Sequence, residues 1–175
     1  IVKVTLKDHG AAPTVAAQTI ASGGARVSAR AETLTPLQTP LVPIKTATVL
    51  NLMKELLSGS IIHNETHGTH CSALARADRI LVLREDIGRH NTIDMLCGYG
   101  LLHQVHPADS IILTTGRISS EIVYKIWNWG IPIVISHSAP TSSAVDMLNK
   151  ANITLIGYVR GGKMNIYSHE RRVTP

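Results

Sequence analysis

The chain has 175 residues, and 44% of them are hydrophobic, which is enough to bury one sizeable core. Its 17 basic and 12 acidic side chains give a formal charge of +5, so we expect an anionic partner such as a nucleotide or a phosphorylated cofactor. Aromatic residues make up only 3% and Phe is absent. Base-stacking platforms are therefore poorly supplied, and the composition argues against a nucleic-acid partner.

The compartment is inferred from the same inventory. No apolar run approaches the length of a membrane span, so no membrane partner is expected. The two cysteines, Cys71 and Cys97, are far apart and match no disulfide framework, which predicts a reducing, cytoplasmic location. We find no signal peptide. Because the chain starts at Ile1 rather than at Met, we expect a leading segment to be missing.

Two parts of unequal regularity make up the chain. Residues 1–47 are predicted to form an N-terminal strand and an irregular region rich in Ala, Thr, Pro and Gly. Residues 48–175 are predicted to form an α/β core, and both parts belong to one structural domain. A helix is predicted over 49–57. The apolar stretch 71–75 predicts one or two further helical turns.

A strand followed by a polar loop recurs along the core. The apolar runs are 80–83, 110–113, 131–135 and 154–159. Helices are predicted after the first three loops, at 92–102, 119–129 and 141–151. The last run is followed, after a short turn, by 164–167, which predicts a hairpin. Strand–helix–strand units with nearly continuous apolar strands favour a mostly parallel sheet that is covered on both faces.

Parallel strands place the loops that follow them along one edge of the sheet, where α/β proteins bind ligands. That edge is predicted to collect cations, hydroxyls and the free N–H groups of helix starts, a set that suits phosphate or pyrophosphate. The candidate residues are Arg89, His90, Gly116, Arg117, Ser138, Thr141, Arg160, Gly161, Gly162 and Lys163. Structural alternatives stay open: a capped turn at 85–91, helix caps at 116–120 and 138–142, and an ordinary hairpin turn at 160–163.

A group of His and Cys residues is the candidate metal site. His67, His70 and Cys71 are a possible zinc set. Zinc sites need three or four ligands, and a second ligand pair such as CxxC is missing, so we expect no metal. Alternatively, Cys71 beside His70 at a helix start would have a lowered pKa. Cys97 is interpreted as a small core residue.

Several stretches together resemble a known family, the formate dehydrogenase accessory proteins. They are THGTHCSAL (66–74), REDIGRHNTID (84–94), TTGRISSEIVYK (114–125), SHSAPTSSAVDM (136–147) and LIGYVRGGKMNIYS (155–168). Their order and spacing make the resemblance specific between Thr66 and Ser168. It implies a three-layer α/β/α, cytidine-deaminase-like fold with a mostly parallel sheet and a C-terminal β-hairpin. It also implies a cytoplasmic homodimer.

The resemblance implies a function as well. Members of this family are sulfurtransferases that take persulfide sulfur from a cysteine desulfurase. They pass it to the molybdenum cofactor in its bis-molybdopterin guanine dinucleotide form, which formate dehydrogenase needs for activity. The cofactor would be a bound substrate with GDP as its mimic, and its guanine nucleotide would lie against the sheet-edge loops. The closing turn is implied among its contacts: Tyr158, Val159, Arg160, Gly161, Gly162 and Lys163.

One departure concerns the cysteine that carries sulfur in the family. The corresponding glycine-rich loop contains Ser22, Gly23 and Gly24 and no cysteine. Three explanations stay open: the loop cysteine is missing from this sequence, which we favour because such loops are mobile; this member lacks the activity; or Cys71, assisted by His70, carries the sulfur. Two other functions also stay open, a zinc-dependent deaminase-like hydrolase on the same fold and a cofactor-binding chaperone without sulfur chemistry.

Overall fold

The computed structural model of the chain describes residues 34–38 and 43–175. The predicted strand at the N-terminus and the glycine-rich loop around Gly23 lie outside these residues, so the prediction of a single domain stays a prediction. In the described part, the helices are α1 (Thr46–Gly59), α2 (Ile61–Thr66), α3 (Arg89–Leu102), α4 (Ser120–Trp129) and α5 (Ser142–Ala151). The strands are β1 (Ile44–Lys45), β2 (His70–Arg76), β3 (Arg79–Asp86), β4 (Ser110–Thr114), β5 (Ile133–Ser136), β6 (Thr154–Arg160), β7 (Lys163–Ser168) and β8 (Val173–Thr174).

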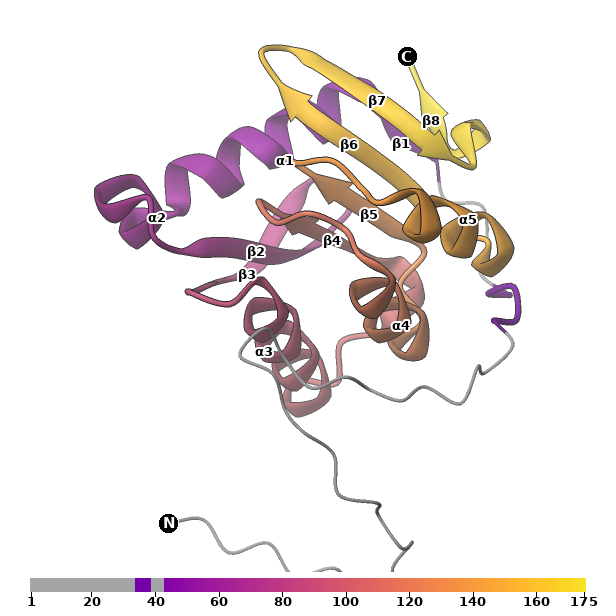
Figure 1. Cartoon of the computed structure of the whole chain (residues 1–175), viewed down its shortest axis with the longest axis horizontal. Helices are drawn as coiled ribbons and strands as arrows, with labels where there is room; N and C mark the ends of the chain where they lie inside the picture. The colour runs from indigo at the N-terminus through magenta and orange to yellow at the C-terminus, as the bar shows by residue number, and fades with distance from the viewer. Residues whose placement is uncertain (1–33, 39–42) are drawn as a thin grey trace, which may run out of the picture. The chain divides into compact units, whose positions relative to one another are not determined.

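A six-stranded sheet in the order β3-β2-β4-β5-β6-β7 forms the centre of this part (Figure 1). Strands β4, β5 and β6 are parallel. Strand β2 is antiparallel to both β3 and β4, so β3 points the same way as β4. Strand β7 returns antiparallel to β6 as a hairpin. The carboxyl ends of β3, β4, β5 and β6 therefore meet at one edge of the sheet.

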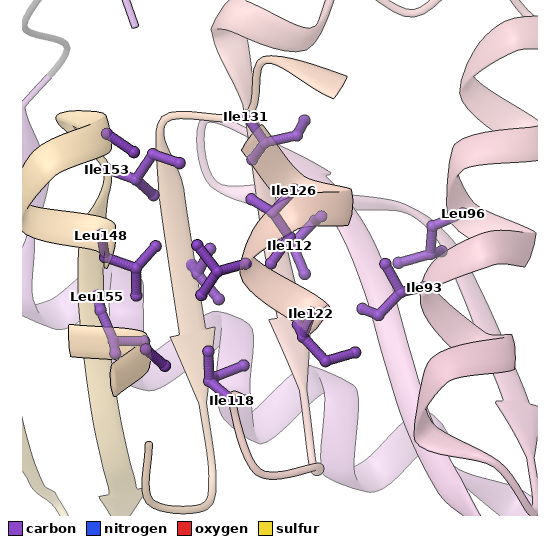
Figure 2. Packing of buried hydrophobic residues seen from close by; sticks show 14 of the residues in the cluster. Ile93, Leu96, Ile112, Ile118, Ile122, Ile126, Ile131, Leu148, Ile153 and Leu155 are labelled. Atoms are coloured by element: carbon purple, nitrogen blue, oxygen red, sulfur yellow. The ribbon is translucent and has the colours of Figure 1, made fainter. Parts of the chain in front are cut away.

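Helices cover the sheet on both faces. Helices α3, α4 and α5 bury Ile93, Ile122 and Leu148 against one face, as Figure 2 shows. Helix α1 buries its apolar side on the other face. Strand β4 serves both layers, because Ile112 points to the first face while its neighbours point to the second. The predicted three-layer α/β/α class, with a mostly parallel sheet and a closing β-hairpin, is confirmed.

Strand β2 is the main correction to the sequence analysis. The prediction of helical turns over 71–75 is wrong, since His70–Arg76 forms a strand paired on both sides. All of Cys71 to Ala75 is buried, and a short apolar run of this length has no periodicity that separates strand from helix. The adjacent six-residue helix α2 was also not predicted. Because β2 is antiparallel, its first residues join the edge where the parallel strands end.

The C-terminal tail is more ordered than a basic sequence suggests. Arg172 is 1% exposed, and its guanidinium donates to Thr154 Oγ1 at 3.1 Å and Asn152 Oδ1 at 3.2 Å. Burial and the charge of Arg171 lower the pKa of Arg172. The next residues form β8, which pairs with β1. The polar, basic sequence of residues 169–175 predicts a solvated end, and the burial of Arg172 contradicts that prediction.

Candidate functional site

The carboxyl edge of the sheet gathers the loops that carry the predicted site residues. We call this edge the rim. It comprises loops 86–90, 115–119, 137–141 and 160–163, together with His70 at the start of β2. Backbone hydrogen bonds join neighbouring loops across it: Thr115 N–H donates to Cys71 O and His137 N–H to Thr114 O, both at 2.9 Å. Tyr158 N–H donates to Ser138 O at 3.2 Å, which ties the hairpin to the same set.

Buried hydroxyl groups beneath the rim loops hold these loops in position through hydrogen bonds. Ser72 Oγ donates to Thr114 Oγ1 at 2.9 Å and lies 2.7 Å from Thr92 Oγ1. Thr114 Oγ1 also accepts from Gly116 N–H at 3.0 Å, and Ser136 Oγ donates to Gly116 O at 2.9 Å. These hydroxyls satisfy the polar groups of loops that leave the sheet, so the loops have a defined conformation.

Arg89 and Arg117 lie close together on the rim. Arg89 begins α3 and packs against Gly116, where a Cβ would lie 2.9 Å from Arg89 Cβ. Gly116 therefore permits the close approach that the sequence suggested. The charges of both arginines lower the pKa of His70, as does its burial, which is the largest cause. The structure thus brings these predicted residues to one place.

Arg160 belongs to the same rim at the β6 end. Burial first and the charge of Arg160 second lower the pKa of His137, which lies in the loop after β5. His63 acts on the pKa of both His70 and His137, so the two halves of the rim are within electrostatic reach of each other. His63 is held in place because its ring Nδ1 bonds to Thr69 O.

Carboxylates near the rim accept hydrogen bonds from backbone N–H groups. Glu85 accepts from the N–H groups of Ile62 at 3.1 Å and His63 at 2.7 Å, which fixes the start of α2. Asp86 accepts from Gly88 N–H at 2.7 Å and from an Asn side chain. Across residues 34–38 and 43–175, no salt bridge neutralises the rim cations, which are Arg89, Arg117, Arg160 and Lys163. The rim is therefore an uncompensated cationic surface, suited to a polyanion.

The hairpin turn has an unusual backbone. Gly161 and Gly162 have φ of +58° and +71°, and Tyr158, which is not glycine, has φ of +55°. A tyrosine in this region is uncommon and marks strain that the surrounding structure must hold. The Arg160 guanidinium lies 4.3 Å from the centroid of the Tyr158 ring. A surface groove of about 590 Å³ lies between this turn and α1 and includes Val159 in its lining.

The remaining predicted residues have mainly structural contacts. Thr141 caps α5, because its side chain accepts from Ala144 N–H at 3.2 Å. Ser138 is half-buried and its N–H donates to Ser136 Oγ. His90, at the first turn of α3, has its pKa lowered chiefly by burial and then by Arg89. Lys163 and the two turn glycines are exposed.

The cysteines do not have the properties of reactive thiols. Cys71 is fully buried in β2, and burial raises its pKa to about 11, so the expected lowering of this pKa is wrong. Burial also raises the pKa of Cys97 to about 11. In the part of the chain that the structure describes, no three His, Cys, Asp or Glu side chains lie close enough to hold a metal ion. His67, His70 and Cys71 thus do not assemble into the possible zinc set.

Two site residues escaped the sequence analysis. His137 lies near Arg160, and His63 lies within electrostatic reach of both His70 and His137, yet neither residue was among the candidate residues. His137 directly follows a strand, which was a usable signal, whereas His63 lies in a helix that the sequence did not predict. Among the described residues, no helix combines the length and the apolar character that a bilayer crossing requires.

Comparison with known proteins gives a consistent assignment. The chain is 44% identical over 133 residues to the sulfur carrier protein FdhD of Bacillus pumilus, covering 76% of this chain and 51% of the relative. The FdhD proteins of Bacillus subtilis and Staphylococcus aureus (strain JH9) are 43% and 40% identical, over 75% and 85% of this chain and 50% and 52% of theirs. The chain thus spans about half the length of these relatives.

A solved structure agrees with these relatives. A crystal structure of a candidate formate dehydrogenase accessory protein from Desulfotalea psychrophila matches with a TM-score of 0.74 and 30% identity, covering 81% of this chain and 62% of that one. A sequence model of the FdhD/NarQ family matches residues 2–174. With nearly its whole length matched in this way, the chain belongs to the FdhD/NarQ family.

Proposed function

We propose that this chain is the cofactor-binding core of a sulfur carrier protein that serves formate dehydrogenase. Its rim holds the molybdenum cofactor in its bis-molybdopterin guanine dinucleotide form, as a substrate rather than a resident group. Sulfur reaches that cofactor as a persulfide supplied by a cysteine desulfurase. The protein acts in the cytoplasm as a homodimer.

The observation that carries this proposal is the set of unpaired cations at one edge of the sheet. Arg89, Arg117 and Arg160 come from three loops, and the described part of the chain offers them no carboxylate. A cofactor with pyrophosphate groups supplies the missing negative charge. Relatives named sulfur carrier proteins, at 40–44% identity, support sulfur carriage as the reaction.

The rim residues would bind and orient the cofactor and exclude water from it, and they would not take part in the chemical step themselves. Arg89 and Arg117 would bind phosphate near β4, and Arg160 with Lys163 would bind it near the hairpin. Binding the cofactor first makes the later sulfur transfer effectively intramolecular. When bound, the cofactor supplies the molybdenum that accepts the sulfur.

A second function is favoured by the state of the two thiols. Cys71 and Cys97 both have a pKa raised to about 11 by burial, so neither is a good acceptor of sulfane sulfur. The chain as given therefore also suits a chaperone that binds the cofactor without carrying sulfur itself. The two functions share the rim and differ only in persulfide formation.

Binding of GDP tests the cofactor site that the two proposed functions share. Isothermal calorimetry should detect GDP binding to the full chain, and Arg117→Ala should weaken it about ten-fold, because a charge-assisted contact to phosphate is lost at an exposed position. Arg79→Ala is the matched control, since Arg79 is an exposed arginine at the opposite end of β3. Equal affinities for the wild type and Arg117→Ala would remove Arg117 from the site.

Mass spectrometry separates the two functions. The intact chain is incubated with a cysteine desulfurase and cysteine, and a persulfide would add the mass of one sulfur atom. No addition would favour the chaperone, in agreement with the raised pKa of the buried Cys71 and the half-buried Cys97. An added sulfur that disappears in Cys71→Ser would restore Cys71 as the carrier and exclude the chaperone.

A further inference from the structure

Most of the surface groove beside α1 lies outside the cofactor site proposed above. The groove has a volume of about 590 Å³ and is an open trough rather than an enclosed cavity. One of its walls is helix α1 and the other is the turn between β6 and β7 (Figure 1). We call it the α1 groove, and the lining residues that matter for its chemistry are Leu50, Met53, Lys54, Leu57, Val159 and Arg160.

The base of the α1 groove is apolar. Met53 and Val159 are only 2% and 1% exposed, so they form its floor. Leu50 and Leu57 are half-buried along the α1 wall. These two leucines are seven residues apart, which places them on the same side of the helix, two turns from each other. Apolar side chains of another molecule would fill such a groove favourably, because they leave water when they enter it.

Each wall of the groove carries one cation. Lys54 lies on the α1 wall and Arg160 on the turn, and both are exposed. Neither side chain forms a salt bridge with residues 34–38 or 43–175. Glu55 follows Lys54 in the chain but does not line the groove. The apolar floor is therefore flanked by two uncompensated cations, which suits a ligand that presents both apolar side chains and carboxylates.

The shape of the groove favours a peptide over a small molecule. Pockets for small ligands enclose most of the ligand surface, whereas the α1 groove is open. Its α1 wall runs from Leu50 to Ser58, about 12 Å at the rise of a helix. That length matches two helical turns, or about four extended residues, of a bound peptide. An added Cβ on Gly161 or Gly162 would meet no atom within 4 Å, so the turn backbone is also accessible to a ligand.

A second copy of this chain does not satisfy the charges of the groove. Two copies related by a two-fold axis would place the groove against the same surface of the other copy. Lys54 and Arg160 of both copies would then come together, and like charges that face each other oppose association. A partner protein with carboxylates has no such repulsion.

We infer that the α1 groove binds an acidic peptide segment of a partner protein. Apolar side chains of the segment lie over Met53 and Val159, and its carboxylates lie at Lys54 and Arg160. The inference goes beyond the proposed function, because it assigns a protein-docking surface whose occupant does not depend on the cofactor.

Selection from a phage library of random peptides of about twelve residues tests the class of ligand. The immobilised full chain is the target, and the most enriched peptide is then made synthetically. We expect this peptide to combine an excess of Asp and Glu with several Leu, Ile or Met residues. Enrichment of neutral or basic peptides, or no enrichment, would overturn the inference.

Calorimetry with the synthetic peptide locates the site. Lys54→Glu should weaken binding about ten-fold, because an attraction is replaced by a repulsion. Leu57→Ala should weaken it about five-fold through lost apolar contact. The matched control is Lys150→Glu, the same change of charge at an exposed position on α5, which packs on the opposite face of the sheet. It should change the affinity by less than about two-fold. Equal weakening by Lys54→Glu and Lys150→Glu, or none by Lys54→Glu, contradicts the inference.

Two further measurements separate this inference from its alternatives. A wild type that binds GDP but enriches no acidic peptide overturns the inference alone, and one that binds the peptide but not GDP overturns only the proposed function. Sedimentation equilibrium tests the second copy: a wild-type dimer that Leu57→Ala dissociates would mean that this chain itself covers the groove. Thermal melting shows whether each variant is folded, and if Leu57→Ala melts early, the exposed Lys54→Glu decides.

Discussion

The two edges of the central sheet carry similar residues in opposite arrangements. At the edge away from the rim, Arg76 and Asp109 form a pair at 3.1 Å, and His106 lies 3.9 Å from the same carboxylate. At the rim, carboxylates such as Glu85 bind backbone N–H groups, and the arginines have no such partner in the described residues. Charge alone therefore does not mark a site; unpaired charge on rigid loops does.

The edges also differ in how their backbone is held. A groove of about 400 Å³ at the far edge is lined by turn and strand-start residues such as Ala77 and Pro132. The rim instead rests on the buried hydroxyls of Ser72, Thr92 and Thr114. Hydroxyls in place of apolar side chains indicate that the rim loops are positioned for more than packing. Variants at matched positions on the two edges can test this difference.

The largest effect is expected at Thr114. Thr114→Val leaves the Ser72 hydroxyl and the Gly116 N–H without their acceptor in a buried place, which should lower the free energy of unfolding by about 1–3 kcal/mol. Urea titration measures the loss. The control is Thr48→Val at the far groove, which should change it by less than about 0.5 kcal/mol. Similar losses for both variants would show that the hydroxyls under the rim have no special role.

A methyl group at Gly116 should disturb the rim itself. In Gly116→Ala the new Cβ would lie 2.9 Å from Arg89 Cβ, so the start of α3 must move, and GDP affinity should fall about ten-fold as Arg89 leaves its position. Gly98→Ala is the control, since no atom lies within 4 Å of its added Cβ. That variant should gain about 0.5–1 kcal/mol of stability from helix propensity and bind GDP normally. Unchanged GDP affinity in Gly116→Ala would argue against a phosphate role for Arg89.

The rim histidines should make stability depend on pH. The pKa values of His70 and His137 are lowered in the folded state, so below about pH 6.5 the unfolded chain binds more protons. Their contribution to stability is complete above that pH and is lost as the pH falls through the folded-state values. In His70→Gln the midpoint of urea unfolding should depend less on pH across this range than it does in the wild type. His106→Gln, at the far edge, should leave the curve unaltered, and an equal flattening by both would contradict the assignment.

The smallest effect is expected from the far-edge ion pair. Asp109→Asn removes the contact with Arg76, but the two side chains are 53% and 44% exposed. Water and salt screen such a pair, so the free energy of unfolding should change by less than about 1 kcal/mol. A larger loss in urea titration would mean that pairing at this edge is as important as the hydroxyl contacts at the rim.

The sequence predicted the parallel centre of the fold because its strands are unambiguous. Ile111 to Leu113 and Ile133 to Ile135 are apolar on both faces, as strands covered by two helical layers must be. Strand β2 was missed because Ser72 and the alanines beside it have weak strand propensity, and only pairing with β3 and β4 makes them a strand.

The candidate site, like the fold, was predicted only in part from the sequence. Arg89, Arg117 and Arg160 follow predicted strands, so topology alone placed them together. The histidines are a different case. The lowered pKa of His70 depends first on burial and then on charges that include Arg89 and Arg117, residues distant in sequence that approach only when β2 runs antiparallel.

The buried Arg172 has a practical consequence for anyone who produces this protein. Its guanidinium bonds two groups at the end of α5 and the start of β6, and Val173 and Thr174 pair with β1 just beyond it. Pro175, just beyond this pairing, is exposed. Trimming the chain before Arg172 would instead remove a part of the interior, and a shortened version should be recovered mainly as aggregate.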